Sequence, residues 1–239
     1  MRSSLFFRDT AGCAKSVPMC QTISIAQAKS HYLGGTSTAH GFDHVLRVTA
    51  LAECIARAEG ADLEIVRTAA LLHDVAAHGQ DRDDHHLVGA ERTVRILLNM
   101  GWPAARTEAV AHCIRAHRFR ASSSRMPPDE IGRKDVPQTL EAQCVFDADK
   151  LDAIGAVGVA RAFAYCAELG QSLWGTVSPE FKAGEHTGEQ HTAHHEFHFK
   201  LLRVRDRLYT RTGRRIAADR HRYMVGFLGR MTSEVAGEL

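Results

Sequence analysis

The stretch AALLHDVAAHG, residues 69–79, places a histidine and an aspartate side by side at the end of an apolar run. Apolar residues recur there at intervals of three and four, which predicts an amphipathic helix over residues 62–77. His73 and Asp74 each have alanine, valine or leucine on their stripe one turn earlier. Both polar side chains are therefore expected to point into the core.

A buried, isolated carboxylate costs several kcal/mol unless a positive group compensates it. Successive helical residues diverge by about 100°, so two neighbouring side chains can bracket one ion that lies between them. A metal ion would thus compensate His73 and Asp74 together. The alternative is a hydrogen-bonded core histidine beside an aspartate that caps the helix or pairs with an arginine.

A second core-facing histidine lies in HGFDHVLRV, residues 40–48. His44 begins a helix with apolar residues four, seven and eleven positions later, so it shares their face. Only a short turn around Gly60 separates this helix from the next, which predicts an antiparallel pair. His44 can then meet His73 and Asp74.

Another carboxylate on an apolar face lies in CVFDADKLDAIGAVGVAR, residues 144–161. Asp149 has apolar neighbours one turn before and after it, whereas Asp147 faces elsewhere and Asp152 lies one turn beyond. Two imidazoles and two carboxylates form a mixed donor set that suits a divalent ion of Mn, Mg, Co, Ni or Fe. Positions left open for water and substrate indicate a catalytic rather than a structural metal.

The rest of the chain shows the same periodicity and almost no strand-like alternation, which predicts an all-α bundle. A break is expected near Thr212 and Gly213, and long loops over residues 120–137 and 175–195. We expect about eight helices, near residues 22–33, 41–59, 62–77, 86–100, 103–118, 138–152, 155–169 and 194–238.

Composition is typical of one globular domain, because 44% of the 239 residues are apolar and 24% are charged. We expect a disordered leader over residues 1–20 and a single domain over 21–239. The net charge of +2 requires no nucleic-acid partner and leaves room for a small anionic substrate. Six cysteines without a C-x-x-C pair predict a reducing, cytoplasmic setting, and no apolar run is long enough for a membrane span.

His44, the pair His73–Asp74 and Asp149, in the order H…HD…D, resemble the HD domain superfamily of metal-dependent phosphohydrolases. The resemblance runs from about residue 40 to about residue 228. It is strongest to small stand-alone bacterial HD hydrolases, some of which act on nucleotides, including a nucleoside triphosphate pyrophosphohydrolase. The phrases that carry it are HGFDHVLRV, GADLEIVRTAALLHDV, FDADKLDAIGAVGVARAFAY, HEFHFKLLRVRDRLYT and ADRHRYMVGFLGRM.

The resemblance implies an HD phosphohydrolase domain over residues 21–239 and a catalytic metal. Asp74 would hold the metal, Asp152 could approach a ligand, and Arg47 is the first candidate for substrate phosphate. An ion pair with a carboxylate on a neighbouring helix is the alternative for Arg47. The metal ligands implied are His44, His73, Asp74 and Asp149.

Further polar residues are candidates for substrate contact. Some HD proteins bind a second metal through two extra histidines, and His86 and His117 are the candidates here, for that role or for phosphate contacts. His198 and Lys150 could also reach the substrate, and Arg161 and Lys200 are weaker candidates. Alanines follow Asp74 where several HD nucleotidases carry an acidic residue, so the proton donor must lie elsewhere.

We therefore expect a metal-dependent phosphohydrolase of a nucleotide or another small phosphate ester, in which a metal-activated water attacks phosphorus. Two alternatives stay open: a non-catalytic sensor that binds metal and nucleotide, and a dinuclear-iron HD oxygenase with six ligands. The partner expected is a small phosphorylated substrate, and a homodimer is compatible with the sequence.

Overall fold

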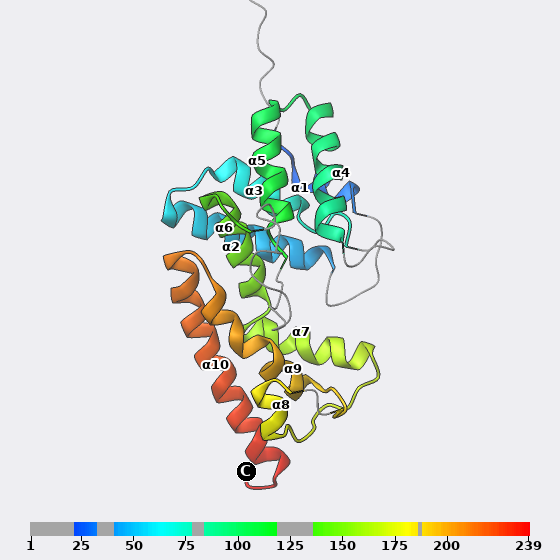
Figure 1. The fold of residues 1–239 in the computed structure, drawn as a ribbon, viewed down its shortest axis with the longest axis vertical. Helices are drawn as coiled ribbons and strands as arrows, with labels where there is room; N and C mark the ends of the chain where they lie inside the picture. The colour runs from blue at the N-terminus through cyan, green and yellow to red at the C-terminus, as the bar shows by residue number, and fades with distance from the viewer. Residues whose placement is uncertain (1–21, 33–40, 78–83, 119–135, 186–187) are drawn as a thin grey trace, which may run out of the picture.

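The computed structural model describes residues 22–32, 41–77, 84–118, 136–185 and 188–239, and every regular element within these ranges is helical (Figure 1). The predicted all-α class is confirmed. Among the described residues there are ten α-helices, eight of them at least seven residues long, and one 3-10 helix. Their bounds are α1 Ile25–Ser30, α2 Phe42–Glu59, α3 Leu63–Leu72, α4 His85–Asn99, α5 Ala104–Arg115, α6 Leu140–Asp152, α7 Gly155–Glu168, α8 Pro179–Ala183, α9 Ala193–Phe199, η2 Leu201–Arg207 and α10 Arg211–Val235.

The helices form an elongated bundle in which α6 connects two halves. Figure 1 shows α3, α4 and α5 in the upper half and α7, α8, α9 and α10 in the lower half. Helix α2 packs against α3 and α6, and α10 packs against α7 and α6. No helix in the described ranges is both long and apolar enough to cross a membrane.

The reversal between α2 and α3 brings distant residues together. Gly60 ends α2 with a φ of 80°, a left-handed conformation that favours glycine. Asp62 then caps α3, since its carboxylate accepts hydrogen bonds from the backbone N–H groups of Glu64 and Ile65. The start of α2 therefore lies beside the end of α3, as the short turn predicts.

Helix α3 is shorter than the range 62–77 expected from the sequence. It ends at Leu72, and residues 73–77 form turns. The His73 Nδ1 atom lies 2.8 Å from the carbonyl oxygen of Ala70. The imidazole therefore donates to a carbonyl group in the last turn of α3, where the backbone supplies no further N–H donors. The pair His73–Asp74 thus sits at the helix terminus rather than within the helix.

The C-terminal break lies earlier than the predicted Thr212–Gly213, between η2 and α10. There the Asp147 carboxylate accepts hydrogen bonds from the backbone N–H groups of Tyr209, at 2.9 Å, and Thr210, at 2.7 Å. Thr210 also caps α10 through the N–H of Gly213. A partner distant in sequence therefore fixes the break.

One of the expected irregular segments differs from the sequence interpretation in extent. The range 175–195 contains α8 and the start of α9, so it is not one continuous loop. Most of the loop over 120–137, and the leader over 1–20, lie outside the described residues.

We predict that Gly213→Ala lowers the free energy of unfolding by about 1–3 kcal/mol. A Cβ atom there would meet the Asp147 carboxylate and lie 2.8 Å from Thr210 Oγ1. Urea unfolding measures the change. Gly229→Ala on the same helix is the control, because nothing lies within 4 Å of its Cβ, and it should gain up to about 1 kcal/mol. Equal effects of both changes would contradict the close approach at Gly213.

Candidate metal centre

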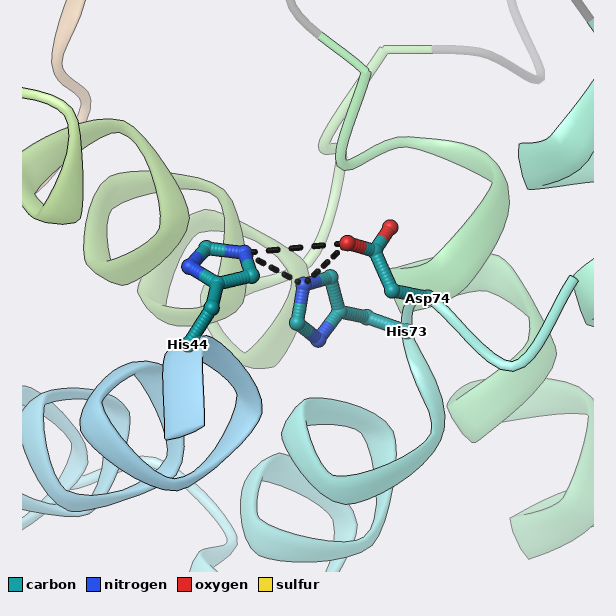
Figure 2. A group of neighbouring side chains, drawn as sticks. All are labelled: His44, His73 and Asp74. Atoms are coloured by element: carbon teal, nitrogen blue, oxygen red, sulfur yellow. Dashed lines mark hydrogen bonds and ion pairs between the residues drawn. The ribbon is translucent and has the colours of Figure 1, made fainter. Parts of the chain in front are cut away.

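Four side chains from three segments converge at the end of α3. The Nε2 atoms of His44 and His73 lie 3.3 Å apart, and Asp74 Oδ2 lies 3.7 Å and 3.5 Å from them (Figure 2). From α6, Asp149 Oδ1 approaches the same two atoms at 3.4 Å and 4.0 Å. The structure therefore brings together all four metal ligands implied by the sequence.

The spacing of these donor atoms fits a divalent ion. Metal bonds to histidine or carboxylate of about 2.1 Å place neighbouring donors about 3.0–3.4 Å apart in octahedral or tetrahedral geometry. The two imidazole nitrogens lie 3.3 Å apart, and each carboxylate oxygen lies 3.4–4.0 Å from both of them. Small side-chain movements would therefore close the cluster around an ion.

Hydrogen bonds orient both imidazoles toward the cluster. His73 Nδ1 donates to the carbonyl oxygen of Ala70, and His44 Nδ1 lies 2.8 Å from Asp152 Oδ2. With each proton on Nδ1, the lone pair of each Nε2 faces the other donors. Such partners behind metal-binding histidines fix the tautomer and the ring orientation.

Burial and neighbouring charges shift the pKa values of Asp74 and Asp149 in opposite directions. Burial alone would raise the pKa of Asp74, but His73 and His117 hold it far below its usual range. Burial likewise opposes ionisation of Asp149, yet the Lys150 ammonium group, 2.6 Å from Oδ2, holds its pKa well below normal. Both groups are therefore anionic at neutral pH, as metal binding requires.

The other oxygen of Asp74 faces two more histidines. Its Oδ1 atom lies 3.5 Å from His117 Nε2 and 3.8 Å from His85 Nε2. His117 Nδ1 lies 2.5 Å from the carbonyl oxygen of Ile114, so this ring is also held with Nε2 toward Asp74. Asp74 is thus shared between two groups of three potential metal ligands.

The sequence predicts His117 and His86 as the two extra histidines. The structure places His117 and His85 beside Asp74. His86 is fully buried in α4, and its ring lies 5.8 Å from the His85 ring. Neighbouring helical residues point about 100° apart, so the choice depends on the phase of α4, which the polar run before it obscures.

Arg47 and Asp152 form ion pairs behind His44. The Asp152 carboxylate accepts hydrogen bonds from Arg47 Nε and Nη2, at 2.9 and 3.1 Å, and from Arg161 Nη1 at 2.9 Å. Arg47 Nη1 also donates to Asp43 at 2.6 Å. Burial would raise the pKa of Asp152, but its hydrogen bonds with His44 and Arg47 lower it to about 2. The structure shows the ion pair that the sequence left as the alternative for Arg47.

The remaining candidates divide into near and distant groups. Lys150 contacts Asp149 directly, and Lys200 is close enough for the charges of both to act on its ammonium group, whose pKa is lowered mainly by burial. His198 lies on α9, and its ring is 5.1 Å from that of His194. Burial lowers the pKa of His198 to about 4. Lys150 and Lys200 thus interact with the cluster, whereas His198 contacts His194.

Comparison with known proteins identifies the family. Residues 41–154 match the model of the HD domain, and this range contains the four candidate ligands His44, His73, Asp74 and Asp149. The chain is 33% identical to the uncharacterized protein YpgQ of Bacillus subtilis over 201 residues, which cover 84% of this chain and 87% of YpgQ.

Solved structures agree with the sequence match. The crystal structure of YpgQ in complex with ADP has a TM-score of 0.67 at 30% identity, covering 90% of this chain and all of that chain. An HD-superfamily hydrolase of Bacillus thuringiensis has a TM-score of 0.66 at 26% identity, and the match covers 89% of this chain and 94% of that chain. The protein therefore belongs to the HD domain superfamily and is similar to stand-alone bacterial HD hydrolases.

Proposed function

We propose that this protein is a metal-dependent phosphohydrolase of a nucleotide or another small phosphate ester. One observation carries the proposal: two ionised carboxylates, one on α6 and one at the end of α3, each lie within 4.0 Å of the same two imidazole nitrogens. Two relatives support it, since YpgQ was crystallised with ADP and the B. thuringiensis protein is described as a hydrolase. Nucleoside triphosphate pyrophosphohydrolysis is the finer form of the proposal.

His44, His73, Asp74 and Asp149 would hold the ion, which is Mn, Mg, Co, Ni or Fe by the mixed donor chemistry. When bound, such an ion polarises a phosphoryl group and makes water more acidic at neutral pH. The low pKa of both carboxyl groups keeps them available as anionic ligands. The cytoplasmic location expected from the cysteine pattern stays a prediction.

The surrounding cationic side chains take two roles in this proposal. Lys150 and Lys200, near Asp149, would neutralise substrate phosphate. Arg47 has all three guanidinium nitrogens bonded to Asp43 or Asp152, so we assign it a positioning role in place of direct phosphate contact. Asp152 is likewise a positioning residue, because it binds the far side of the His44 ring.

A two-metal site is the second candidate, favoured by the trio Asp74, His85 and His117. A carboxylate with one oxygen toward each group of ligands is suited to bridge two ions. Such a site is compatible with phosphohydrolysis and with the dinuclear-iron oxygenase alternative. Tight nucleotide binding without turnover would instead indicate a sensor.

We predict that the purified protein with Mn, Co, Ni or Mg releases phosphate or pyrophosphate from members of a nucleotide panel. His73→Ala and Asp74→Ala should lower kcat about a hundredfold or more, since even supporting residues of metal sites cost 10–100-fold. Asp219→Ala, on the exposed face of α10, is the control and should keep wild-type rates. Absence of turnover with every metal would contradict the proposal.

We predict that Asp152→Ala weakens binding of Mn²⁺ about 10–100-fold, because His44 loses the partner that fixes its tautomer. Isothermal titration calorimetry measures the affinity. Asp152→Asn should be milder, since its amide oxygen can still accept from His44 Nδ1. Asp43→Ala removes only the outer partner of Arg47 and should change little. Unaltered Mn²⁺ affinity in Asp152→Ala would remove Asp152 from the positioning role.

We predict that Mn²⁺ titration reveals a second ion that binds more weakly than the first. The trio Asp74, His85 and His117 has only one carboxylate, and it shares this carboxylate with the first group of ligands. His117→Ala should reduce the stoichiometry from two ions to one, whereas His198→Ala should leave it unchanged. Metal analysis after gel filtration gives the count. A single ion in the wild type at saturating Mn²⁺ would disprove the two-metal site. Two irons with oxygen consumption would favour the oxygenase.

A further inference from the structure

A groove of about 380 Å³ lies between the end of α1 and the outer face of α4. Residues from α4 line one side at intervals of three and four, and the residue that ends α1 lines the other. The lining consists of His31, Arg92, Arg95, Ile96, Asn99 and Met100. None of these residues belongs to the two groups of potential metal ligands.

Among the described residues that line this groove, Arg92 and Arg95 are cationic and none is acidic. Neither arginine forms an ion pair within the described ranges. Arg92 donates a hydrogen bond to the carbonyl oxygen of Val75, at 3.2 Å, so no described carboxylate offsets its charge. Burial lowers the pKa of His31, and the charge of Arg92 lowers it further, so positive groups crowd this groove.

Uncompensated guanidinium groups that share a groove are suited to bind an oxyanion. The planar fork of arginine matches the oxygens of a phosphate group, and the Asn99 amide adds a donor and an acceptor. Ile96 and Met100 supply an apolar wall. The volume lies within the range of about 300–1,000 Å³ typical of small-molecule sites.

We propose that this groove binds the phosphate groups of a small phosphorylated molecule, at a site separate from the metal centre. The inference goes beyond the proposed hydrolysis and does not depend on it. Its ligand would bridge Arg92 and Arg95 through phosphate oxygens and place its remaining atoms against the apolar wall. Inorganic diphosphate and a nucleoside diphosphate share this chemistry.

The groove nevertheless shares backbone support with the metal centre. Arg92 binds the carbonyl oxygen of Val75, which directly follows Asp74. On the opposite wall, Tyr32 follows His31 and its hydroxyl donates to the carbonyl oxygen of Leu71, at 2.9 Å. Side chains from both walls therefore hold the segment that carries the His73–Asp74 pair.

The test is calorimetric titration of the full-length, Mn²⁺-loaded protein with methylenediphosphonate, a diphosphate analogue that resists hydrolysis. We expect two binding events. Arg95→Glu should weaken one of them at least about tenfold, because it reverses a charge in the groove. The same reversal at Arg222, which is 77% exposed on α10, should leave both events unchanged.

The variants and probes separate the possible outcomes. Arg95→Gln, which removes the charge without reversing it, should have a smaller effect, and thermal melting shows whether each variant is folded. A crystal soaked with methylenediphosphonate should show density between Arg92 and Arg95. Titration with α,β-methylene ADP compares a nucleotide with the inorganic diphosphate analogue. If Arg95→Glu weakens binding of either ligand, the site is supported. The ligand that binds more tightly then shows whether the groove suits a nucleotide or inorganic diphosphate.

A titration of Arg95→Glu identical to that of the wild type, or density only at the metal cluster, would overturn the proposal. Arg95 has no place in the hydrolytic site, so Arg95→Glu should keep wild-type nucleotide turnover. If the wild type hydrolyses nothing but still binds methylenediphosphonate in a way that Arg95→Glu abolishes, the proposed function fails and the groove site stands.

Discussion

Near-complete burial of the Asp74 carboxylate, whose side chain is 13% exposed, is the constraint on which the site depends. An ionised carboxyl group in a helical core needs compensating positive groups or hydrogen-bond donors on every side. Here the rings of His44 and His73 lie against one oxygen, and those of His85 and His117 lie against the other. These histidines come from α2, the start of α4 and the residues that follow α3 and α5, so four helices converge on one carboxylate. An ion held between these rings would compensate its charge.

Helix α6 connects the cluster around Asp74 to the half of the protein that contains α10. At about 100° per residue, Asp149 and Asp152 lie about 60° apart on the helix, and Asp147 lies on a distant face. Asp149 therefore faces the Nε2 atoms of His44 and His73, Asp152 binds the back of His44, and Asp147 fixes the start of α10. The same short helix supplies both a candidate ligand and the attachment of the C-terminal helix.

Features that depend on local pattern could be predicted from the sequence. The helical class, the reversal at Gly60 and the meeting of His44 with His73 and Asp74 follow from periodicity and turn chemistry. The break before α10 could not, because its cause is a bond to Asp147, 63 positions from Thr210 in sequence. The position of His85 beside Asp74 could not be predicted either, because it depends on the phase of α4.

The charges around the cluster explain why an anionic substrate suits it. The carboxylates of Asp74, Asp149 and Asp152, each at most 14% exposed, are matched in number by the cationic groups of Arg47, Arg161 and Lys150, so these charges cancel. Asp43 also binds Arg47, but it is 63% exposed and screened by water. A divalent ion would therefore leave a positive excess, which favours a phosphate group over a neutral ligand in a site of low dielectric constant.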